Sequence, residues 1–293
     1  MWGQFGYISG AQERTFLSRD IDGPHGEPEF PLLPFLLLAF VLAWLPWAAV
    51  VSLEGEPGWL SAVLQALATS APGVAALVVA GRASGWAGLR KVLKPLGRYR
   101  VGGAWYALAL LGPPLLMAAA VALHVALGGR PPDLPDAGRW LLIPGLLVLV
   151  LLIGGPLGEE PGWRGYALPI LQRRFGPVTG ALVLGLVWAV WHLPLRLIPG
   201  TPQAQLPLLL IVVQTVAVSL ILAWILSGTG GSLLLVVLAH ASINTWAGPL
   251  RVLPVDAGSI RPYAIATAFI VALAVPAAVQ LTTKESVAAS DPS

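Results

Sequence analysis

The sequence predicts an all-α, polytopic membrane protein with about eight transmembrane helices. Of its 293 residues, 56% are hydrophobic and 11% are charged, and the mean hydropathy is +0.78. Soluble domains carry about 25% charged residues, so this composition excludes a soluble globular enzyme. The chain has no cysteine. That absence excludes disulfides, a thiol nucleophile, thiolate metal ligands and an iron–sulfur cluster.

Eight apolar runs approach the roughly 20 residues that a helix needs to cross a bilayer. They lie at about 31–53, 59–81, 101–127, 139–158, 178–198, 207–227, 232–249 and 262–282. Residues 1–30 are predicted to form a polar N-terminal tail without the features of a signal peptide. Residues 283–293 are predicted to form a short polar C-terminal tail. Because no linker separates soluble blocks, residues 31–282 are predicted to form a single transmembrane domain.

Lysine and arginine predict the orientation, because they concentrate in cytoplasmic loops. Residues 82–100 carry six of them, which predicts a cytoplasmic segment that lies on the bilayer as a basic amphipathic stretch. Alternation from this segment places both termini in the cytoplasm and twelve of the seventeen basic residues inside. We therefore expect an integral protein of the cell membrane, and we read the net charge of +3 as membrane orientation rather than nucleic-acid binding.

Two adjacent carboxylates, Glu159 and Glu160, follow the fourth apolar run. Ionisable groups within a bilayer are costly and therefore often mark function. Glu160 and Arg164 would share a helical face if a helix restarts at Pro161, since they are four residues apart. That pairing would leave Glu159 available as a general base for water. The alternative is an acid pair at the membrane surface, followed by an arginine that reaches the headgroups.

Two further apolar runs each contain a histidine with a neighbour one helical turn away. Trp188 precedes His192 by four residues and would wall the same helical face. His240 and Asn244 have the same spacing, so both are expected to point into the bundle, where they could donate hydrogen bonds to an oxyanion. The structural alternatives are a histidine satisfied within the core and an asparagine that joins two helices.

The three clusters are expected to converge on one polar cavity, because polar groups in hydrocarbon cost least when they share it. Residues 175–177 form the predicted turn, with Glu159 seventeen residues before Gly176 and His192 sixteen after it. An antiparallel pair of helices would therefore bring the two sites level. Simple alternation instead places Glu159 at the cytoplasmic end of 139–158. A break around 154–162 or at Pro169 would resolve the conflict.

The three motifs resemble those of the CPBP family of intramembrane endopeptidases, the CAAX-processing and bacteriocin-protection group that includes the type II CAAX prenyl endopeptidases. The family pattern is E-E-x-x-x-R, then F-x-x-x-H, then H-x-x-x-N or H-x-x-x-B. The corresponding residues here are Glu159-Glu160-x-x-x-Arg164, Trp188-x-x-x-His192 and His240-x-x-x-Asn244. The resemblance covers about 139–249. Trp188 replaces the usual phenylalanine, a conservative aromatic exchange, and Pro161 stands where an aliphatic residue is common.

The resemblance implies a glutamate-type intramembrane protease. Glu159 would be the general base, and His192 would help to hold and activate the water. His240 and Asn244 would stabilise the oxyanion of the tetrahedral intermediate. The remaining motif residues would support the site: Glu160, Arg164 and Trp188. The implied substrate is a membrane-associated peptide, with the prenylated CaaX C-terminus of the eukaryotic branch as one candidate.

Several alternatives stay open on the sequence alone. Glu159, His192 and His240 have the ligand types of a catalytic zinc site, but the sequence contains no H-E-x-x-H helix. We therefore expect a mechanism without a metal or other cofactor, with a zinc-dependent protease as the alternative. A non-catalytic scaffold or immunity protein and a proton-coupled transporter are the alternatives from other classes. The expected partners are the lipid bilayer and a lipidated or transmembrane peptide, and not a nucleic acid.

Overall fold

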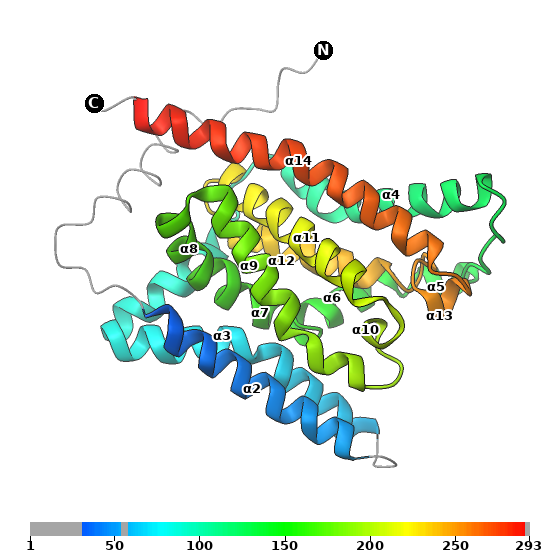
Figure 1. Ribbon diagram of the computed structural model, residues 1–293, viewed down its shortest axis with the longest axis horizontal. Coiled ribbons are helices and arrows are strands. Elements are labelled where there is room, and N and C mark those ends of the chain that lie inside the picture. Colours follow the sequence, from blue (N-terminus) through cyan, green and yellow to red (C-terminus); the bar gives the residue numbers. More distant parts are fainter. Residues whose placement is uncertain (1–30, 54–57, 291–293) are drawn as a thin grey trace.

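The computed structural model describes residues 31–53 and 58–290, and helices dominate these two ranges (Figure 1). The membrane-length and near-membrane-length helices are α2 (Leu32–Ser52), α3 (Gly58–Leu93), α4 (Gly103–Ala126), α9 (Pro177–Trp191), α11 (Leu208–Gly228), α12 (Leu233–Trp246) and α14 (Arg261–Ser290). The shorter elements are η1 (Lys94–Gly97), α5 (Ala137–Trp140), α6 (Ile143–Ile153), α7 (Pro156–Gly162), η2 (Trp163–Ala167), α8 (Leu168–Phe175), η3 (Leu193–Leu197), α10 (Pro202–Gln205) and α13 (Pro254–Ala257). The predicted polytopic helical membrane fold is confirmed.

Each of the eight predicted apolar runs contains helix, but the described residues hold fewer full-length spans. Six helices are long and apolar enough to cross a membrane, and a bent pair, Gly138–Ile153 with Pro156–Phe175, makes a seventh. The remaining run forms α12, which has 14 residues. At 1.5 Å per residue α12 is about 21 Å long, short of the roughly 30 Å hydrocarbon core. The count of about eight spans is therefore corrected to six or seven.

The helix break predicted near the paired glutamates is present. The chain leaves α6 at Gly154, and Gly155 adopts φ 105°, a conformation that L side chains rarely adopt. The next helix begins at Pro156, whose ring sets the φ that a first helical residue needs. The predicted restart at Pro161 is wrong, because Pro161 lies inside α7. The two halves of the bent span meet at 41°.

This break also corrects the predicted end of the fourth span. The helical path continues from α7 through the π-helical stretch η2 and α8 to Phe175. Gly176, with φ 82°, then reverses the chain into α9, as the spacing of the motifs predicted. Glu159 therefore lies within the bundle, about 24 Å of helix away from the turn, rather than at the cytoplasmic end of a span. The position that simple alternation of the spans predicted for Glu159, at the end of 139–158, is therefore wrong.

Glycines allow α3 and α7 to touch backbone against backbone beside the glutamates. A Cβ atom on Gly162 would lie 2.3 Å from the carbonyl oxygen of Pro72, and one on Gly73 would lie 2.4 Å from that of Gly158. Both distances are far below any contact that real Cβ atoms make. A side chain at either position would push the two helices apart, so the placement of α7 depends on these glycines.

The basic segment 82–100 is folded back on the bundle rather than extended from it. Helix α3 breaks at Ser84 and Gly85, and the returning turn brings Gly88 against the carbonyl oxygen of Ala80. Further along, Arg98 donates to the carbonyl oxygen of Gly230, and Ser232 Oγ donates to that of Arg98 at 2.5 Å. The segment is thus anchored to the turn between α11 and α12. Its exposed cations are Arg82, Arg90, Lys91, Lys94 and Arg100.

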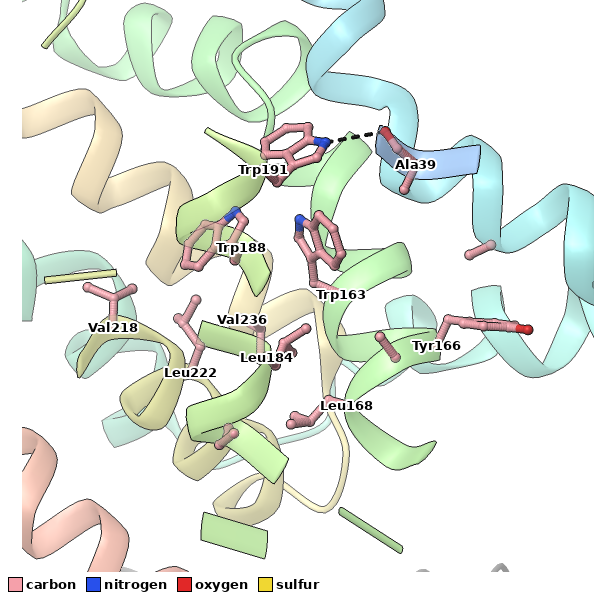
Figure 2. Packing of buried hydrophobic residues seen from close by; sticks show 14 of the residues in the cluster. Ala39, Trp163, Tyr166, Leu168, Leu184, Trp188, Trp191, Val218, Leu222 and Val236 are labelled. Atoms are coloured by element: carbon pink, nitrogen blue, oxygen red, sulfur yellow. Dashed lines mark hydrogen bonds between the residues drawn. The ribbon is translucent and has the colours of Figure 1, made fainter. Parts of the chain in front are cut away.

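Tryptophans form the part of the core that surrounds the motif helices. Trp163, Trp188 and Trp191 gather between α7–η2 and α9 (Figure 2). The rings of Trp163 and Trp191 meet edge to face at 5.7 Å, and Trp191 Nε1 donates to the carbonyl oxygen of Ala39 at 3.3 Å. Large rigid rings fill space with few rotatable bonds, so they hold α9 firmly against α2 and η2.

The predicted tails are described only in part. The N-terminal tail, residues 1–30, lies outside the described residues. At the other end α14 continues to Ser290, so the first residues of the predicted polar tail extend the last helix. The last three residues are outside the described ranges.

Candidate active site

The two adjacent glutamates occupy different environments on α7. Glu160 is completely buried, and its Oε1 atom accepts from Arg164 Nη1 at 2.9 Å and contacts His240 Nδ1 at 2.7 Å. The predicted pairing of Glu160 with Arg164 is therefore present, and both side chains are 0% exposed. A buried carboxylate is stable only with such partners. Glu160 thus joins α7, η2 and α12 through one hydrogen-bonded cluster.

Glu159 has no such ion pair in the described structure, and it retains 3% exposure. Its Oε2 atom accepts a hydrogen bond from Trp188 Nε1 at 2.8 Å. Its Oε1 atom faces Gly155, where a Cβ atom would lie only 2.4 Å away. One carboxylate oxygen is therefore held by the indole N–H. The other lies close to Gly155, which has no side chain to occupy that space. Gly155 is a site residue that the sequence analysis did not single out.

His192 lies directly after the last residue of α9 and is partly buried. Its Nδ1 atom lies 2.9 Å from the carbonyl oxygen of Trp188. Because a carbonyl can only accept, Nδ1 carries the proton in this contact, and Nε2 of the neutral ring is left as an acceptor. His192 packs against the rings of Trp188 and Trp191, at centroid distances of 5.5 and 4.9 Å.

The third motif is only half buried, contrary to the sequence prediction. His240 points into the bundle as expected and lies within electrostatic reach of Glu159 and of His192. Asn244, one turn further along α12, is exposed. The prediction that both side chains point into the bundle is therefore wrong for Asn244. Helical spacing places two residues on the same face of a helix, but α12 is covered along only part of that face.

Trp188 links the three motifs, a role larger than the wall that its spacing predicted. Its indole donates to Glu159, and the guanidinium carbon of Arg164 lies 4.3 Å from the centre of its ring. The ring of His240 meets it edge to face at 5.3 Å. The sequence does contain a signal for this role. Among phenylalanine, tyrosine and tryptophan, only tryptophan carries an N–H donor.

The three motifs thus come together as predicted, through contacts that bridge α7, α9 and α12, while the polar cavity stays a prediction. A metal-ligand set is a different matter. Within the described ranges, no three His, Asp or Glu side chains are arranged so that they could hold a metal ion. Glu160 and the Trp188 carbonyl take one nitrogen each of His240 and His192.

Comparison with known proteins places the site within a recognised domain. Residues 141–246 match the family model described as type II CAAX prenyl endopeptidase Rce1-like. A curated relative, CAAX prenyl protease 2 of Methanococcus maripaludis, is 25% identical over 138 residues. The matched region is 45% of this chain and 51% of the relative, so the chain spans about half the length of that relative. All seven motif residues fall inside 141–246. The motif-bearing region of this chain is therefore similar to the Rce1-like type II CAAX prenyl endopeptidase domain.

Proposed function

We propose that this protein is an intramembrane endopeptidase that hydrolyses a peptide bond with water activated by Glu159. The observation that carries the proposal is the contrast between the two glutamates. Glu160 is closed off by Arg164 and His240, whereas Glu159 keeps one oxygen beside Gly155 and a small exposed edge. A positioned carboxylate of this kind suits general-base catalysis. The family match of the surrounding residues supports the same activity.

In the proposed reaction, Glu159 takes a proton from a water molecule while the water oxygen attacks the carbonyl carbon of the substrate. The new C–O bond gives a tetrahedral intermediate with a negative oxygen. This intermediate collapses with cleavage of the C–N bond, and Glu159 passes its proton to the leaving amine nitrogen. This transfer restores the carboxylate of Glu159. The new carboxylic acid then loses the remaining proton of the water, so the products are a carboxylate and an amine.

The two histidines have complementary proposed roles. Neutral His192 presents Nε2 as an acceptor, which suits it to hold one hydrogen of the water. His240, fixed through Nδ1 by Glu160, donates from Nε2 to the oxyanion when it is protonated. Asn244 is proposed to add a second donor from the exposed part of α12 once substrate covers it.

The proposed substrate is a lipidated or transmembrane peptide, because the reacting groups lie among helices that are long and apolar enough to cross a membrane. The curated relative is named a CAAX prenyl protease, so a prenylated CaaX peptide is the first substrate to test. The purified protein is expected to cleave this peptide, and comparison with its unprenylated twin measures whether the lipid is recognised. Failure to cleave any lipidated or transmembrane peptide of a broad panel would contradict the proposal.

We further propose that the reaction needs no metal. Cleavage by the purified protein is then expected to survive a chelator, measured as an unchanged kcat after dialysis against it. Loss of activity that added zinc restores would contradict this part of the proposal and leave the protease assignment intact.

We propose that the protein lies in the cell membrane with both termini in the cytoplasm, on the basis of its basic residues. Helix α4 offers a direct test, since Arg100 and Asp133 are both exposed and lie beyond its opposite ends. The natural chain has no cysteine, so single Arg100→Cys and Asp133→Cys variants carry one thiol each. In intact cells, an impermeant maleimide is expected to label position 133, and position 100 only after permeabilisation. The reverse pattern would contradict the orientation.

A further inference from the structure

We propose that Trp188 is a positioning residue whose indole N–H holds the carboxylate of Glu159 in its reacting orientation. The proposal rests on the function assigned above to Glu159. The bond from Trp188 Nε1 to Glu159 Oε2 measures 2.8 Å, and both residues are buried. A hydrogen bond to an ionised group is stronger than one between neutral groups, particularly away from water. It turns Oε1 toward Gly155, where the absence of a side chain allows the carboxylate oxygen to approach the backbone closely.

The indole can act in this way because its own position is fixed from three sides. Arg164 lies over its face at 4.3 Å, which is a favourable arrangement for a cation and an electron-rich ring. His240 meets it edge to face, and Trp188 lies in the tryptophan cluster of Figure 2. A ring held by these contacts presents its N–H in one direction. Glu159 is thereby restricted to one of the orientations that its flexible side chain could otherwise adopt.

The same residue also sets the tautomer of His192, through a separate group. The backbone carbonyl of Trp188 accepts from His192 Nδ1, so any side chain at this position would retain that contact. Only the indole N–H reaches Glu159. Replacement of the side chain therefore isolates the hydrogen bond to the carboxylate and leaves the histidine contact in place.

The exchange from phenylalanine, the residue of the family pattern, is consequently not conservative in this chain. Phenylalanine keeps an aromatic face for Arg164 but has no hydrogen to donate to Glu159. Trp188→Phe is expected to lower kcat about tenfold to a hundredfold, the effect of losing a hydrogen bond to a charged group. The KM is expected to stay within about twofold, because no contact with the bound substrate is removed.

Trp163→Phe supplies the matched control. Trp163 is also fully buried in the tryptophan cluster, but its Nε1 has no hydrogen-bond partner within residues 31–53 and 58–290. The Trp163→Phe variant therefore loses the same atoms without losing a hydrogen bond. Its kcat is expected to stay within about threefold of that of the natural protein. Equal losses in the two variants, or an unchanged kcat in Trp188→Phe, would overturn the proposal.

A second variant tests the donor directly. In Trp188→His, the imidazole Nε2 occupies the place of the indole Nε1, since the two five-membered rings superimpose atom for atom. The kcat of Trp188→His is expected to exceed that of Trp188→Phe, although the histidine ring is smaller. A Trp188→His variant that is no better than the phenylalanine variant, with both proteins folded, would contradict a role for the donor.

Difference infrared spectroscopy provides a measurement that needs no substrate. The carboxylate band of Glu159 is identified by subtraction of the Glu159→Gln spectrum. This band is expected to shift in Trp188→Phe and to stay unchanged in Trp163→Phe. An unshifted band would overturn the positioning role whatever the activity. A shifted band in a protein that cleaves no peptide would instead contradict the function proposed for the site.

Discussion

Replacement of Glu159 by glutamine is expected to lower kcat for peptide cleavage by about three orders of magnitude. General-base catalysis contributes about 10²–10⁴-fold, and a glutamine amide cannot accept the proton of the attacking water. The amide also fills the same space, so Trp188 Nε1 can still donate to its oxygen. The measurement is single-turnover cleavage of a prenylated peptide, with the thermal unfolding midpoint recorded in the same detergent.

Asp136→Asn is the matched control for this change. Asp136 is an exposed carboxylate at the start of α5, outside the three motifs, and neutralising it removes the same charge. Its kcat is expected to remain within about twofold of the natural value. If Glu159→Gln retained substantial activity while Glu160→Gln lost it, the roles assigned to the two glutamates would have to be exchanged.

Replacement of Arg164 by leucine is expected to reduce the free energy of unfolding by about 3–5 kcal/mol, the cost of leaving a buried charge without its partner. Glu160 would then retain His240 as its remaining polar partner within the described structure. Trp188 would also lose the cation over its ring. The measurement is chemical unfolding in detergent micelles, followed by circular dichroism.

Arg139→Leu provides a control with the same substitution in an exposed pair. Arg139 and Asp136 form an ion pair at 3.5 Å, and their side chains are 69% and 70% exposed. Pairs in water contribute at most about 1 kcal/mol, so this variant is expected to unfold close to the natural protein. Similar losses in the two variants would show that burial does not determine the effect, contrary to the structure of the glutamate cluster.

Some features of the site could be predicted because they depend on spacing along one helix or across one turn. Glu160 and Arg164 pair because residues four apart share a helical face. Glu159 lies beside the helical turn from Trp188 to His192 because both lie a similar number of residues from the chain reversal at Gly176. The apolar runs likewise predicted the helices, since a bilayer-length hydrophobic run has few other stable structures in lipid.

Other features depend on which helices pack together, and the spacing of residues along the sequence does not predict that. Asn244 has the same spacing from His240 as Arg164 has from Glu160, yet Asn244 is exposed and Arg164 is buried. The difference arises because neighbouring elements enclose Arg164, whereas the end of α12 is less completely covered. Gly155 was recognisable as part of a break, but its nearness to Glu159 depends on the φ that the chain adopts there.

The sequence by itself determined that this is a helical membrane protein, where its apolar helices lie and which three motifs carry polar groups into them. These properties follow from local composition and helical period, so no long-range contact is needed to infer them. Only the tertiary structure decided that Trp188 donates to Glu159, that His240 is the second partner of Glu160, and that the break of the fourth span lies at Gly155 rather than at Pro169. Such contacts join residues up to eighty positions apart, and helix packing, rather than any local pattern, brings them within bonding distance.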